Sequence, residues 1–120
     1  GNLNPTRDFV YISDICESFF HVMRSRKLFG EATNIGTKRE ISINNLTKLI
    51  LKKMNVKRSI LTNDSRIRPK TSEVERLLCN NSKIINNTRW KPSVKLDEGL
   101  DKTIRWFEEN RIFNNNDYVI

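Results

Sequence analysis

The chain has 120 residues, of which 37% are hydrophobic and 30% are charged, and this composition favours one small globular domain with a modest core. No apolar run approaches the roughly 20 residues that a membrane-spanning helix needs, and no charged-then-apolar N-terminal segment indicates secretion. The formal net charge of +8 leaves nucleic-acid binding open, although Lys and Arg are scattered along the chain without interleaved aromatic residues. Acidic surface of the same protein outside this chain would explain the charge equally well. We expect a cytoplasmic protein for which nucleic acid is an unlikely partner.

Apolar periodicity and turn residues predict seven helices and strands followed by a frayed tail at 111–120. In chain order, they are a strand over 9–12, a helix from a cap at Ser13 or Asp14 to about 26, a strand over 32–36, a helix capped by Ser42 and ending near 54, a strand over 59–62, a helix over 82–88 and a helix over 96–110. This order is that of an α/β fold.

The sequence offers few residues for catalysis or metal binding. His21 lies in the middle of a predicted helix, without a set of Cys or carboxylate partners. The four glycines are too widely spaced for a Gly-rich phosphate loop. Cys16 and Cys79 lack metal-ligand spacing, and both are predicted to be small core residues in a reducing compartment. The sequence therefore predicts no self-sufficient active site.

The segment 68–78 has the clearest ligand-binding pattern. Pro69 fixes its own φ and favours an extended Arg68, so the Arg68 side chain leaves the backbone at a defined angle. Arg offers a planar fork of donors to a phosphate, and a carboxylate such as Glu73 accepts hydrogen bonds from ribose hydroxyls. Taken alone, the segment is more simply a solvated charged loop.

Four pieces of the sequence occur in the order of a known family. They are Pro-Thr-Arg-Asp-Phe-Val-Tyr-Ile-Ser-Asp at 5–14, Asn-Ile-Gly at 34–36 with Ile-Ser-Ile at 41–43, Arg-Pro at 68–69 with Glu-Val at 73–74 and Asn-Ser-Lys at 81–83, and Trp-Lys-Pro at 90–92 with the Leu-Asp-Glu-Gly-Leu helix start at 96–100. Together they resemble the C-terminal third of the extended short-chain dehydrogenase/reductase family, the nucleotide-sugar epimerases and 4,6-dehydratases. The sequence at 68–77 is most similar to that of the 4,6-dehydratases of legionaminic acid synthesis. In GDP-mannose 4,6-dehydratases the stretch between the Arg-Pro and the Glu-Val is shorter, and UDP-glucose 4-epimerases resemble this segment less.

The resemblance implies a substrate-binding role for five residues. Arg7 and Arg68 would contact the diphosphate of a nucleotide-sugar, Phe9 would lie beside the ribose or phosphate, Ile43 would pack against the base, and Glu73 would hold ribose hydroxyls. From the residues alone, Arg7 is as readily half of a surface ion pair, and Phe9 and Ile43 are as readily core. Lys95 and Arg89 depart from the family pattern, where relatives often carry a capping Ser or Thr and a Gly.

The resemblance also implies the C-terminal part of an extended Rossmann-type dehydrogenase: the last sheet strand or strands and a small substrate-binding α/β subdomain. The Gly-rich half that binds NAD and the catalytic Tyr and Lys would lie in an N-terminal part, since neither Tyr11 nor Tyr118 has a lysine four residues later. Alone, residues 1–120 would be inactive and would expose apolar surface. The intact enzyme would be a homodimeric 4,6-dehydratase or, as the nearest alternative, a 4-epimerase.

Overall fold

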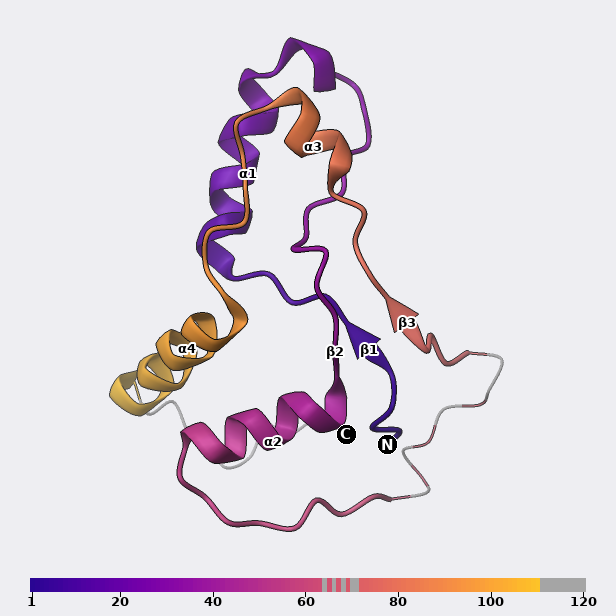
Figure 1. Ribbon diagram of the computed structural model, residues 1–120, viewed down its shortest axis with the longest axis vertical. Helices are drawn as coiled ribbons and strands as arrows, with labels where there is room; N and C mark the ends of the chain where they lie inside the picture. The colour runs from indigo at the N-terminus through magenta and orange to yellow at the C-terminus, as the bar shows by residue number, and fades with distance from the viewer. Residues whose placement is uncertain (64, 66, 68, 70–71, 111–120) are drawn as a thin grey trace.

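The computed structural model describes residues 1–63, 65, 67, 69 and 72–110, and within these it is a mixed α/β structure (Figure 1). The predicted α/β class is therefore confirmed, while the predicted tail at 111–120 lies outside the described residues. In chain order, the elements are β1 (Thr6–Arg7), α1 (Ile12–Arg24), the short 3-10 helix η1 (Arg26–Leu28), β2 (Ile41–Ser42), α2 (Ile43–Lys53), β3 (Arg76–Leu77), α3 (Ser82–Asn87) and α4 (Leu96–Asn110).

The three described strands form one small sheet in the order β2-β1-β3. β1 runs antiparallel to β2, with Thr6 opposite Ser42, and parallel to β3, with Thr6 opposite Arg76. The Thr6 amide extends this pairing by donating to the Glu75 carbonyl at 2.8 Å. The central strand therefore joins the start of α2 to a segment from much later in the chain.

None of the three predicted strands is found where it was predicted. The strand expected at 9–12 lies at Thr6–Arg7 instead, and Ile12 already opens α1. The segments 32–36 and 59–62 are not strands. Their β-branched residues favour extended backbone, but a strand also needs a neighbouring segment to pair with, and none of the described segments pairs with them.

The helices agree better with the sequence. The Ser42 side chain caps α2 as predicted, because its Oγ accepts from the Asn45 amide at 3.2 Å. The predicted bounds of α4 match those observed. In contrast, neither Ser13 nor Asp14 caps α1, because the helix begins at Ile12 and Asp14 is buried inside its first turn.

A small core lies where α1, η1 and α3 meet, at the upper end of the molecule in Figure 1. Leu28, Ile84 and Trp90 are fully buried there, and Val22 and Ile35 pack against them. The two helices that lie lower in Figure 1, α2 and α4, are linked by an ion-paired lysine: the Lys53 Nζ lies 2.9 Å from Asp97 and 2.7 Å from Asp101.

Much apolar surface stays exposed, as the resemblance led us to expect. The accessible surface is 10151 Å², whereas a compact monomer of this mass has about 6,700 Å². The Cα radius of gyration is 17.3 Å, against about 14 Å for a compact chain of this length. Part of the exposed apolar surface is on α1, where the exposed large side chains are Ile12, Phe19, Phe20 and Met23. Cys16, on the same helix, is also exposed and so is not the predicted core residue. No helix among the described residues is long and apolar enough to cross a membrane.

Candidate nucleotide-sugar site

Two of the five predicted site residues, Arg7 and Glu73, form an ion pair beside the sheet. The Arg7 Nη2 lies 3.6 Å from Glu73 Oε1, and the two side chains are 23% and 15% exposed. Arg7 belongs to the central strand, and Glu73 lies three residues before β3, its parallel neighbour. The other guanidinium nitrogen, Nη1, donates to the Thr6 carbonyl at 2.8 Å. Pairing of β1 with β3 thus brings together two groups that the sequence holds far apart.

Phe9 follows β1 closely in the sequence, and Ile43 lies close to β1 in space. The Ile43 amide donates to the Pro5 carbonyl at 3.1 Å, which seats the start of α2 against the residue before β1. The Ile43 side chain is half-buried, and Phe9 is 39% exposed. Arg68, the fifth predicted residue, lies outside the described residues. The structure therefore gathers the described candidates around one strand.

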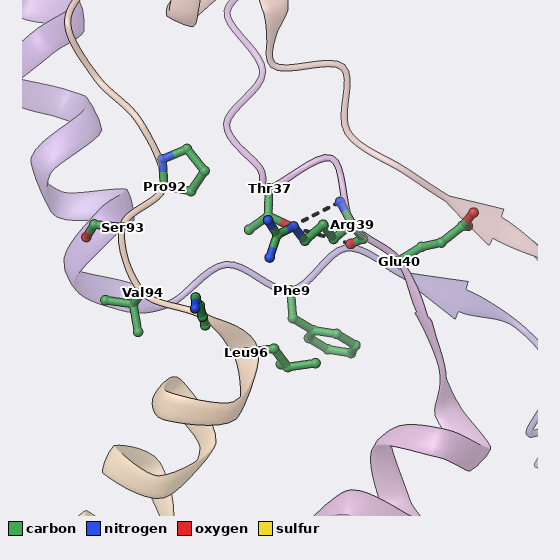
Figure 2. A pocket seen from close by; sticks show the side chains of 9 residues that line it. Phe9, Thr37, Arg39, Glu40, Pro92, Ser93, Val94 and Leu96 are labelled. Atoms are coloured by element: carbon green, nitrogen blue, oxygen red, sulfur yellow. Dashed lines mark hydrogen bonds between the residues drawn. The ribbon is translucent and has the colours of Figure 1, made fainter.

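Phe9 lines a pocket of about 220 Å³ between the loop before β2 and the segment that enters α4 (Figure 2). Two cations line it as well, Arg39 and Lys95, and neither forms an ion pair with another described residue. In Figure 2 the Glu40 side chain points away from the pocket, while the Phe9 ring lies beside Leu96. The pocket thus combines an aromatic face with positive charge.

A second pocket, of about 480 Å³, lies beside Arg7. Its polar lining includes Arg7 and asparagines from two separate segments, and its apolar lining comes from Ile35, from β3 and from the residues that follow β3. The lining residues are Arg7, Asp8, Thr33, Asn34, Ile35, Leu77, Leu78, Cys79 and Asn80. A guanidinium at the edge of a partly apolar hollow is suited to a ligand with one anionic group and an uncharged ring.

Asp8, which the sequence analysis did not single out, anchors the walls of this second pocket. Its carboxylate accepts hydrogen bonds from the Thr37 hydroxyl, from the Thr37 and Lys38 amides at 3.0 and 2.9 Å, and from the Cys79 amide at 3.3 Å. The only signal in the sequence was its place beside Arg7 in the Arg-Asp-aromatic piece. Because the Asp8 carboxylate accepts mainly from backbone amides, it supports the site and is not a free base.

Glu40 is a second residue that sequence reasoning missed. It accepts from the Thr6 hydroxyl at 2.7 Å and from two nitrogens of Arg76, Nε at 2.8 Å and Nη2 at 2.7 Å. The hydrogen bonds from Arg76, followed by that from Thr6, lower the pKa of the Glu40 carboxyl to about 2. This cluster joins the loop before β2 to β1 and β3, on the three strands that carry the candidate site.

The described residues do not fit an NAD site or a metal site. None of the described glycines forms the closely spaced loop that cradles a dinucleotide, and no three His, Cys, Asp or Glu residues among those described could share a metal ion. Binding of an anionic ligand by Arg7 is the chemistry that the arrangement can perform.

Known proteins share this fold and its sequence pattern. Human dTDP-D-glucose 4,6-dehydratase is 32% identical over 123 residues, which cover 92% of this chain and 32% of the human protein. UDP-glucose 4-epimerase from Thermotoga maritima, solved with UDP-glucose, superimposes with a TM-score of 0.80 at 26% identity over 92% of this chain and 34% of its own. dTDP-glucose 4,6-dehydratase from Bacillus anthracis, solved in complex with NAD, has the same fold, with a TM-score of 0.77 at 23% identity over the same shares.

The chain is thus a small α/β piece, and in each matching Rossmann-type epimerase or dehydratase structure it corresponds to about a third of the length. The family described as GDP-mannose 4,6 dehydratase matches residues 1–103, and the chain belongs to this family of extended short-chain dehydrogenases, the NAD-dependent sugar epimerases and dehydratases. It is related both to nucleotide-sugar 4,6-dehydratases and to 4-epimerases. The chain spans about a third of the length of the curated relatives it matches.

Proposed function

We propose that residues 1–120 are the C-terminal, substrate-binding portion of an NAD-dependent nucleotide-sugar 4,6-dehydratase. This portion binds the nucleotide-sugar and is inactive alone. The NAD site and the catalytic residues belong to an N-terminal portion, and the intact enzyme is a cytoplasmic homodimer that dimerises through parts outside this chain.

The observation that carries the proposal is the ion pair at 3.6 Å between Arg7, on β1, and Glu73, in the segment that leads into the neighbouring strand β3. A nucleotide-sugar presents a diphosphate and ribose hydroxyls a few ångströms apart, and these groups need a cation and a carboxylate at similar separation. In the proposal Arg7 and Arg68 contact the diphosphate, and Glu73 accepts from the ribose. Phe9 flanks the ribose, and Ile43 packs on the base.

The same portion of a 4-epimerase is the second candidate. The Thermotoga maritima relative solved with UDP-glucose favours it, because that protein has the same fold at 26% identity. The product formed by a complete polypeptide containing this chain separates the two. A 4-keto-6-deoxy nucleotide-sugar supports the dehydratase, and a sugar inverted only at C4 contradicts it.

The binding role can be tested directly by calorimetric titration of the chain with UDP, GDP and dTDP at two salt concentrations. We expect one nucleotide to bind more tightly than the others, and we expect Arg7→Ala and Arg68→Ala each to weaken its affinity about tenfold or more, as for loss of a charge-assisted contact. Lys52→Ala, on the exposed face of α2, is the matched control and should bind as the wild type does.

A chain that is folded by circular dichroism but binds none of the three nucleotides would contradict the proposal. In that case Arg7 is an ordinary ion-paired strand residue. Salt-dependent binding of arbitrary duplex DNA in place of nucleotides would instead favour the nucleic-acid function that the net charge leaves open.

A further inference from the structure

Arg7 is held by two contacts before any ligand arrives. Its Nη1 donates to the Thr6 carbonyl at 2.8 Å, and its Nη2 lies 3.6 Å from the Glu73 carboxylate. A guanidinium carries five N–H donors in one plane, so two fixed contacts orient the plane and leave other donors for a ligand. An arginine that is already ordered loses less side-chain freedom when it binds.

Glu73 is itself held in place. Its amide donates to the Pro69 carbonyl at 3.2 Å, and the following residues pair with β1 through the bond from the Thr6 amide to the Glu75 carbonyl. The Glu73 side chain is the more buried member of the ion pair. Its carboxylate is therefore fixed relative to the strand that carries Arg7, and its attraction for the guanidinium is less screened than that of a fully exposed pair.

We infer that Glu73 is a positioning residue for Arg7, in addition to any contact it makes with ribose. The inference rests on the proposed function, since it assumes that Arg7 binds the phosphates of a nucleotide-sugar. It has a consequence that ribose recognition lacks: Glu73 contributes to the binding of a diphosphate that carries no ribose and no base.

Inorganic pyrophosphate is the probe that separates the two roles. Its affinity and that of UDP are measured by calorimetry for the wild-type chain and for Glu73→Ala, Glu73→Gln and Glu75→Ala. The Glu75→Ala variant is the matched control, because Glu75 is exposed, forms no ion pair with another described residue and carries the same charge two positions away. It reports how much the loss of one negative charge by itself favours an anion.

We expect Glu73→Ala to weaken pyrophosphate binding about fivefold, the effect of losing one partly buried ion pair. UDP binding falls by at least as much. Glu73→Gln keeps an oxygen that can accept from Arg7 and so binds pyrophosphate with an affinity between those of the wild type and Glu73→Ala. Glu75→Ala binds pyrophosphate as tightly as the wild type or more tightly.

Pyrophosphate binding by Glu73→Ala that equals or exceeds that of Glu75→Ala, with weaker UDP binding, overturns the positioning role and leaves Glu73 as a ribose contact only. A wild-type chain that binds neither probe overturns the proposed function, and this inference with it. If Glu73→Ala does not fold by circular dichroism, the comparison of Glu73→Gln with Glu75→Ala decides the question by the same criterion.

Discussion

At the scale of single residues, the buried carboxylate of Asp14 connects α1 to the segment that enters α4. It accepts from the Ser93 amide at 3.0 Å, the Ser93 hydroxyl at 2.6 Å and the Val94 amide at 3.0 Å. The Asp14 carbonyl also accepts from the Trp90 indole at 2.9 Å. The sequence predicted a cap at this position because Asp commonly starts helices, but a partner almost eighty residues away binds the carboxylate instead.

Asp14→Ala is expected to lower the free energy of unfolding by about 3 kcal/mol, because three hydrogen bonds that a buried, charged carboxylate accepts are lost. Urea denaturation followed by circular dichroism measures the change. Glu17→Ala, on the exposed surface of the same helix, should change the free energy by no more than about 0.5 kcal/mol. Equal effects of the two substitutions would show that the Asp14 contacts do not stabilise the fold.

The Glu40 carboxyl gives a prediction about pH. Its pKa is about 2 in the folded chain, against an ordinary value of 4.5. Because folding lowers this pKa, Glu40 stabilises the fold above about pH 4.5, and this stabilisation is lost as the pH falls towards 2. In Arg76→Ala the pKa should rise towards 4.5, since the main cause of the shift is removed. NMR titration of the Glu40 side chain measures both values, and an unchanged pKa in the variant would contradict the assignment.

The candidate site was only partly predictable from residues. The resemblance gave Arg7, Glu73, Phe9 and Ile43 as candidates, and their position around β1 is a property of strand pairing that no local pattern contains. Asp8 was not predicted, because most of its hydrogen-bond donors are backbone amides, which no sequence pattern distinguishes. The roles of the site residues remain predictions.

At the scale of elements, helices could be predicted and strands could not. Helix α4 has an apolar stripe and a full fifteen residues, so its own periodicity defines it. Each strand has two residues, too few for an alternating pattern, and exists because of its neighbours. The aromatic and β-branched residues at 9–12 and the β-branched residues at 32–36 favoured strands by propensity, and tertiary contacts decided otherwise.

At Gly36, the segment before β2 packs closely against Cys79, in the segment that follows β3. A Cβ added at this position would lie 2.3 Å from the Cys79 Cβ and 3.0 Å from the Asp8 carboxylate. The Gly36 carbonyl also accepts from the Nδ2 of the buried Asn81 side chain at 2.7 Å. Gly36→Ala should therefore lower the free energy of unfolding by about 1–3 kcal/mol, as overpacking does.

Chemical denaturation of Gly36→Ala, of Cys79→Gly and of the double variant measures this effect. Because Cys79→Gly removes the atoms that collide, the double variant should lose less stability than the sum of the two single variants. Simple additivity would show that the contact is relieved by backbone movement. Gly30→Ala is not a suitable control, because its φ of +74° adds backbone strain of its own.

At the scale of the whole molecule, α1 presents Phe19, Phe20 and Met23 to solvent. An apolar face of this kind favours association. In the proposed intact enzyme the N-terminal portion covers this face. The isolated chain should therefore self-associate, and a Phe19→Gln/Met23→Gln variant should be more monomeric at the same concentration.

Sedimentation velocity measures this difference. Glu17→Gln is the control, because it changes a polar position on the same helix and should leave the association unchanged. A wild-type chain that stays monomeric at high concentration would contradict the prediction.

The pairing of β1 with β3 also bears on the kinetics of folding. Contacts such as the bond from the Cys79 amide to Asp8 span 71 residues of sequence. A loop of that length must close before β3 joins the sheet, so the pairing of β1 with β3 forms late, whereas β2 is nearer to β1 in sequence and can pair with it earlier. A ligand that bridges Arg7 and Glu73 can recognise only the closed form. Such a ligand should slow unfolding while leaving the folding rate almost unchanged.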